Sequence, residues 1–116
     1  MMLIMEANPP PWEIEYYNRR VQAWADALPS GIQADLLHLL RRMRQYGPVL
    51  GMPYIRPMGG GLCEVRAKGA EGIARAFFCA VVGRRIVILH GFIKKTEQTP
   101  RHELELARKR LKEVRP

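Results

Sequence analysis

Residues 61–93 constrain the fold most, because they contain three strand-like runs with almost nothing between them. The runs lie at residues 62–67, 73–82 and 85–93, and each is rich in apolar side chains. Turns of only a few residues, each containing glycine, join them. A parallel crossover needs a dozen or more residues, so connections this short allow only antiparallel pairing. The sequence therefore predicts a three-strand antiparallel meander at the centre of the fold.

One further strand and two helices are predicted before the meander. Residues 12–16 alternate apolar and polar side chains, which is the period of a half-buried strand. Apolar residues at helical spacing predict helices over residues 19–28 and 31–46. Ser30 is followed three residues later by Gln33, which matches a capping box. We therefore expect the Ser30 side chain to cap the second helix.

The end of the chain predicts a last, basic helix. Thr99 is expected as its N-cap and Pro100 as its first residue. Residues 1–11 include three consecutive prolines and are expected to form a flexible tail, which leaves residues 12–116 as a single domain. The expected fold is α+β, with an N-terminal strand and a helical hairpin packed on a small antiparallel sheet, followed by a C-terminal helix.

The positive charge of the chain is concentrated in its second half. The formal net charge is +8, and residues 61–116 contain thirteen Lys and Arg against six Asp and Glu. A positive field of this strength favours an anionic partner, which can be nucleic acid, an acidic protein or an anionic membrane. The alternative is a basic protein whose charge only keeps it in solution.

Several classes of protein are disfavoured. No apolar run approaches the roughly 18 residues of a membrane-spanning helix, and the start lacks the basic segment of a signal peptide, so we expect a cytoplasmic protein outside the membrane. Cys63 and Cys79 lie in apolar runs without a companion histidine cluster, which favours buried thiols and no metal site. The sequence contains no GxxxxGK[ST] loop, so no cofactor is indicated. It also contains no Ser–His–Asp arrangement that would indicate an activated nucleophile.

The strand arginines are the candidate functional residues. By alternation, Glu64 and Arg66 share one face of the first run of the meander. Arg75 shares its face of the next run with apolar residues, where a charge must be paired or solvated. Two interpretations stay open. Arg75 either forms a salt bridge with Glu64 across the sheet, or it faces an open groove and binds phosphate.

His90, Lys94 and Lys95 lie at the end of the third run. His90 follows three apolar residues, so it is either a hydrogen-bonded core histidine or a general acid or base. Alternation turns Lys94 and Lys95 to opposite sides, so we expect one of them to face the same site as the arginines. The alternative for both lysines is a solvated strand end.

Together these motifs resemble the RelE/HigB superfamily, and in particular its phage-derived HigB-like branch. The resemblance covers residues 12–114 and rests on L-x-E-x-R at 62–66, Arg75, H-G-F-x-K-K at 90–95 and T-P-x-x-E at 99–103. It implies a microbial-ribonuclease-like α+β fold and the toxin of a type II toxin–antitoxin pair. The implied partners are a cognate antitoxin, expected to be a helix-turn-helix protein, and mRNA on the ribosome.

The resemblance also implies a chemistry. Such toxins cut mRNA through attack of the substrate's own 2′-hydroxyl, which leaves a cyclic phosphate and needs no metal. The motif match carries the catalytic role to Arg66, Arg75, Lys94 and Lys95. From the chemistry alone, His90 or Tyr54 is the candidate for proton transfer. The candidate contacts to the RNA backbone are Lys68, Arg108, Lys109 and Lys112. The alternative function is a non-catalytic module of the same fold that binds an antitoxin or nucleic acid.

Overall fold

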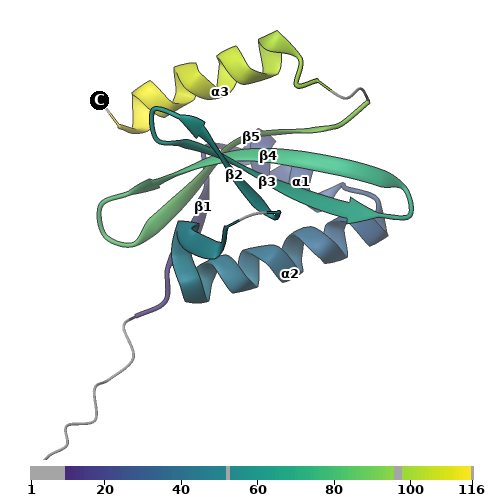
Figure 1. Cartoon of the computed structure of the whole chain (residues 1–116), viewed down its shortest axis with the longest axis horizontal. Coiled ribbons are helices and arrows are strands. Elements are labelled where there is room, and N and C mark those ends of the chain that lie inside the picture. Colours follow the sequence, from purple (N-terminus) through teal and green to yellow (C-terminus); the bar gives the residue numbers. More distant parts are fainter. Residues whose placement is uncertain (1–9, 52, 96–97, 116) are drawn as a thin grey trace, which may run out of the picture.

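The computed structural model describes residues 10–51, 53–95 and 98–115 and confirms an α+β fold (Figure 1). The described residues form, in order, β1 (Glu13–Tyr16), α1 (Arg19–Asp26), α2 (Ser30–Tyr46), the 3₁₀-helix η1 (Gly47–Leu50), β2 (Ile55–Gly59), β3 (Leu62–Gly69), β4 (Gly72–Val81), β5 (Arg85–Ile93) and α3 (Arg101–Val114). Most of the predicted tail, residues 1–9, lies outside the described part of the chain. Within that part, no helix is long and apolar enough to span a membrane.

The strands form one sheet in the order β1-β5-β4-β3-β2. The predicted meander is confirmed, because β3 pairs antiparallel with β4 and β4 pairs antiparallel with β5. The sheet as a whole is mixed rather than antiparallel, since β1 pairs in parallel with β5. At the opposite edge β2 pairs antiparallel with β3, which places Arg56 opposite Glu64.

Helices cover both faces of this sheet. Figure 1 shows α3 on one side of the strands and α2 on the other, and α1 packs on the same face as α2. The core beneath α3 includes Phe77 of β4 together with Ala107 and Leu111 of the helix. Side chains two residues apart share a face of a strand. Arg75 therefore lies on the α3 face beside Phe77, and Glu64, opposite Phe77 on β3, lies there too.

The predicted cap of α2 is wrong. The Ser30 side chain makes no capping hydrogen bond, and the amides of Gly31 and Ile32 donate instead to the Glu71 carboxylate, at 3.0 and 3.2 Å. Gln33 turns its side-chain amide back to the carbonyls at the end of α1. The turn between β3 and β4 carries Glu71 to the helix, so a carboxylate distant in the sequence replaces the local cap.

The predicted cap of α3 is also wrong. The helix begins at Arg101, with Pro100 as its cap residue and no side-chain capping hydrogen bond. The Thr99 hydroxyl instead accepts a hydrogen bond from Arg75 Nη1 at 2.6 Å. Thr99 therefore ties the entry of α3 to β4 rather than to the helix itself.

A β-bulge in β5 shapes the face beneath α3. The pairing of β4 with β5 shifts between Phe77 and Phe78, which leaves Leu89 as the extra residue. Because a bulge interrupts the alternation of side chains, Leu89 and His90 both face α3. Arg110 of α3 donates to the Leu89 carbonyl at 2.7 Å and so gives this carbonyl a partner.

Gly91 follows the bulge and allows α1 to approach the sheet. The Trp24 ring of α1 lies so close to this glycine that a Cβ atom there would collide with it. The glycine of the H-G-F motif therefore permits a close contact between a helix and a strand.

Candidate functional site

Arg66 and Arg75 form the centre of the candidate site. They lie opposite each other on β3 and β4, on the sheet face that α3 covers. Like charges directly opposite each other repel, so this pair needs a nearby anion. The Nε atom of each guanidinium is buried, and neither finds a hydrogen-bond partner among the described residues. Buried donors normally have partners, so these two atoms are the unusual feature of the site.

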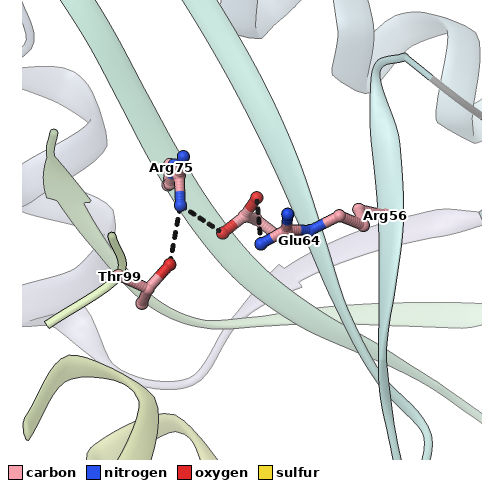
Figure 2. Close-up of polar contacts among 4 residues, drawn as sticks. All are labelled: Arg56, Glu64, Arg75 and Thr99. Atoms are coloured by element: carbon pink, nitrogen blue, oxygen red, sulfur yellow. Dashed lines mark hydrogen bonds and ion pairs between the residues drawn. The ribbon is translucent and has the colours of Figure 1, made fainter. Parts of the chain in front are cut away.

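Glu64 supplies the anion. Its side chain is fully buried, with Oε2 3.4 Å from Arg75 Nη1 and Oε1 3.9 Å from Arg56 Nη2 (Figure 2). Of the two interpretations of Arg75, the structure shows the salt bridge across the sheet. Arg75 does not face an open groove, since only 6% of its side chain is exposed. Oε1 accepts no hydrogen bond from the described residues, so charge rather than hydrogen bonding holds this oxygen in place.

Thr99 covers Arg75 from the side of α3. Figure 2 shows the Thr99 hydroxyl and the Glu64 carboxylate converging on the same nitrogen, Arg75 Nη1. That nitrogen is therefore engaged, whereas Nε of the same guanidinium is not.

Lys68 and Lys94 form a second row of cations beside the arginine pair. Lys68 lies opposite Ile73, and the Lys94 amide donates to the Ile73 carbonyl from the other side at 2.7 Å. Since residues two apart share a face, this row continues the face that carries the arginine pair. Alternation turns Lys95 the other way, where it is exposed. The structure thus places Lys94, rather than Lys95, on the arginine face.

His90 stands apart from the arginine pair. Its Nε2 lies 2.7 Å from Glu103 Oε1 of α3, and the two side chains are 17% and 18% exposed. Its ring packs on Phe92 at 6.4 Å between centroids. Phe77 is opposite His90 and Phe92 is opposite Arg75, so His90 lies one row away from Arg75. These contacts match the interpretation of a hydrogen-bonded core histidine.

The predicted RNA contacts do not lie together. Lys68 belongs to the row beside the arginine pair, whereas the other three are on α3. Arg108 donates to the backbone carbonyls of Met58 and Gly59, at 2.8 and 3.2 Å, and so ties α3 to the β2–β3 hairpin. Lys109 and Lys112 are exposed to solvent.

Sequence reasoning missed three residues of this site, namely Arg56, Thr99 and Glu103. Arg56 is there because β2 pairs with β3 in the register that places it opposite Glu64, which no local pattern signals. Thr99 carried a signal that indicated a helix cap instead. Glu103 is the last residue of the T-P-x-x-E motif, and membership of this motif was the signal in the sequence that could have indicated its contact with His90.

The cysteines contribute no activated nucleophile. Burial raises the pKa of the Cys63 thiol, and burial likewise raises the pKa of the Cys79 thiol. Thiolate chemistry needs a lowered pKa. Within the described ranges, no three His, Cys, Asp or Glu side chains are grouped so that they could hold a metal ion. The arrangement offers several cations around one buried carboxylate, and of these cations only Arg75 is itself buried. Such a cluster is suited to binding an anion.

Residues 23–112 match the family model described as "Phage derived protein Gp49-like (DUF891)". The matched segment begins in α1 and ends in α3, so it contains the arginine pair, Glu64 and His90. No curated protein matches the chain.

Proposed function

Because the chain belongs to the phage-derived Gp49-like family, a RelE-like toxin family, we propose that it is the toxin of a type II toxin–antitoxin pair, of the HigB-like branch, and that it cleaves mRNA on the ribosome. The observation that supports nuclease activity is the Arg66–Arg75 pair. The Nε donors of both arginines are buried and lack hydrogen-bond partners among the described residues. Donors held in this way are suited to a phosphate whose charge increases during the reaction.

The proposed reaction is a transesterification within the RNA chain. The 2′-hydroxyl loses its proton and attacks the adjacent phosphorus, and the bond from phosphorus to the 5′-oxygen breaks. The leaving oxygen takes up a proton, so the products are a 2′,3′-cyclic phosphate and a 5′-hydroxyl. Negative charge grows on the non-bridging oxygens, where the guanidinium forks of Arg66 and Arg75 would bind. One preorganised donor stabilises such a transition state by roughly 3–4 kcal/mol.

Neighbouring side chains take separate roles in this proposal. Lys94, next to the arginine pair, stabilises the attacking or the leaving oxygen. His90 lies one row away from Arg75 and has the contacts of a core histidine, but it is the proposed proton-transfer group, with its ring oriented by Glu103. The reaction proposed here uses neither a metal nor a cofactor, because the arginines and the lysine supply the positive charge.

The covered state of Arg75 favours a second candidate function. Glu64 and Thr99 both occupy Nη1, so a phosphate must displace one of them or bind through Nε or Nη2. If the guanidinium is purely structural, the chain is a non-catalytic module of the same fold that binds an antitoxin or nucleic acid.

The proposed partners are a cognate helix-turn-helix antitoxin, mRNA and the ribosome, in the cytoplasm. The net charge of +8 supports an anionic partner, because it attracts polyanions over long range.

Expression in bacteria without the antitoxin tests the proposal. The variants are Arg75→Ala, Arg75→Lys and, as a control, Arg41→Ala, since Arg41 is exposed on α2 at the opposite face of the sheet. We expect the wild type and Arg41→Ala to stop growth and to create new mRNA 5′ ends, and Arg75→Ala to do neither. Arg75→Lys keeps the charge but loses the fork, so cleavage should fall roughly 100-fold.

The outcomes separate the two candidate functions. Circular dichroism of each purified variant distinguishes lost activity from lost folding. A folded wild type that creates no new 5′ ends but binds RNA or an antitoxin would support the non-catalytic module. Full cleavage by a folded Arg75→Ala would remove Arg75 from the reaction, whereas full cleavage by Arg75→Lys would show that the charge suffices without the fork. Purified protein, assayed on mRNA with and without ribosomes, tests the dependence on the ribosome.

A further inference from the structure

An open groove lies at the far end of α3 from the arginine pair. It has a volume of about 510 Å³ and is lined by Gly60, Arg108, Leu111, Lys112 and Arg115. Its walls are the hairpin between β2 and β3 and the C-terminal half of α3. Three of these lining side chains are cationic and none is acidic.

The carboxylates of α3 do not offset this charge. Each is engaged with a residue outside the groove: Glu103 with His90, Glu105 with Arg101, and Glu113 with Tyr17. Among the described residues that line the groove, none neutralises its positive charge.

The hairpin glycines hold two of the cations in position. Gly59, Gly60 and Gly61 have φ angles of +94°, +65° and +90°, a left-handed backbone that favours glycine. A Cβ atom at Gly61 would collide with the Arg115 guanidinium, so this side chain lies directly against the hairpin. Arg108 donates from Nη1 to the Gly59 carbonyl at 3.2 Å. Both guanidiniums are thus positioned before a ligand arrives, which reduces the entropy lost on binding.

We infer that this groove is a second phosphate-binding site, which holds the sugar-phosphate backbone of the RNA whose scissile phosphate lies at the arginine pair. The inference rests on the proposed function for the identity of its ligand. A guanidinium has five N–H donors, and Arg108 spends two on the hairpin carbonyls, so three remain for phosphate oxygens. Among the described residues that line the groove, Leu111 is the one large apolar side chain. A protein partner would need a larger apolar anchor, whereas an RNA backbone needs none.

The spacing of the two sites sets the length of RNA required. Thr99 contacts Arg75 just before α3 begins, and Leu111 lines the groove near its end. The 10 positions from Arg101, where α3 begins, to Leu111 correspond to about 15 Å at the helical rise per residue, and Thr99 lies two residues before the helix. An RNA that contacts both sites must therefore extend over several nucleotides.

Binding of an uncleavable RNA to the full-length chain tests this site. The probe is a fluorescein-labelled, single-stranded 2′-O-methyl RNA of about 12 nucleotides, within the size range of single-strand sites. Fluorescence anisotropy gives Kd over a series of salt concentrations for Lys112→Ala/Arg115→Ala. The matched control, Arg41→Ala/Arg44→Ala, removes the same charge from exposed positions on α2. We expect the groove variant to bind the RNA about tenfold more weakly than the wild type. The slope of log K against log salt concentration should fall by about 1.4, or about 0.7 per lost phosphate contact. The control should keep the affinity and the slope of the wild type.

Two results would overturn the inference. The first is that the groove variant and the Arg41→Ala/Arg44→Ala control bind the RNA alike. The second is that poly-glutamate competes as well as RNA, which would assign the groove to an acidic protein. Cleavage is measured separately. If RNA binding depends on the groove but the protein makes no new 5′ ends, the phosphate-binding groove is supported and the nuclease activity is contradicted. If the protein cleaves mRNA but the groove variant binds RNA as well as the wild type, only the groove is contradicted.

Discussion

Glu64 is a fully buried carboxylate whose counter-charges are the guanidiniums of Arg75 and Arg56. Removing one partner of a buried ion pair leaves an uncompensated charge, which costs about 3–5 kcal/mol. We therefore expect Glu64→Gln to lower the free energy of unfolding by about 3 kcal/mol, as measured by urea denaturation. The control is Glu105→Gln, which breaks the exposed pair with Arg101 and should cost about 0.3–0.5 kcal/mol. Equal losses in the two variants would contradict the prediction.

Alternation along each strand grouped Glu64 with Arg66 and, separately, Arg75 with its apolar neighbours. Placing the two arginines on the same face of the sheet also needs the register that sets Arg66 opposite Arg75, which the sequence did not provide. Alternation could not decide whether Arg75 is covered or open. That depends on Thr99, and the contact of Thr99 with β4 is set by the path of the chain into α3 rather than by any pattern within a strand.

Among the elements, α2 depends on a cap from another part of the chain. Hydrogen bonds from the backbone amides of Gly31 and Ile32 hold the pKa of Glu71 below its ordinary value of 4.5. A carboxyl group whose pKa is lowered by folding stabilises the fold above its unfolded pKa, and that stabilisation is lost as the pH falls through the folded pKa. We expect Glu71→Gln to lower Tm at pH 7, and the difference from the wild type to shrink below pH 4.5. An equal difference in Tm at pH 7 and about pH 3 would show that the charge of Glu71 is not responsible.

The contact between α1 and β5 depends on the missing side chain of Gly91. Gly91→Ala places a methyl group where the Trp24 ring lies, and overpacking of this kind costs about 1–3 kcal/mol. Trp24→Leu provides space for the methyl group, so the double variant should lose less stability than the sum of the two single variants. Thermal or urea unfolding of all four proteins measures the difference. Strictly additive losses would mean that the ring and the methyl group do not meet.

Most elements were predictable here, whereas η1, β2 and the ends of the elements were not, because residues 47–61 are rich in glycine and proline and read as a loop. The strand and helix patterns are local, and the three-strand meander followed from its short turns. The capping box at Ser30 and Gln33 failed because Glu71, which lies far away in the sequence, provides a charged acceptor for the same amides. The bulge at Leu89 was equally hidden, because it depends on how β5 pairs with β4 rather than on the composition of β5.

At the scale of the whole molecule, the layers follow from the sequence but the sheet edges do not. The meander and the basic last helix could both be predicted, and together they predict an anion-binding face beneath or beside that helix. The order of the strands could not be predicted, because two α-helices, a 3₁₀-helix and three strands separate β1 from its partner β5 in the sequence. Arg56 reaches Glu64 for the same reason, through the pairing of an edge strand.

The parallel pairing of β1 with β5 also dictates an order of events while the chain is being synthesised. Glu13 pairs with Arg85, 72 positions later, so the first strand to leave the ribosome must wait for the last one before it has a neighbour. The β3–β4 hairpin, in contrast, brings Arg66 and Arg75 together from adjacent stretches of chain. Thr99, which covers Arg75, emerges after both. In a growing chain, the Arg66–Arg75 pair therefore forms first, the β1–β5 edge of the sheet second, and the contact of Thr99 with Arg75 last. The contacts that span the greatest length of sequence are expected to form most slowly.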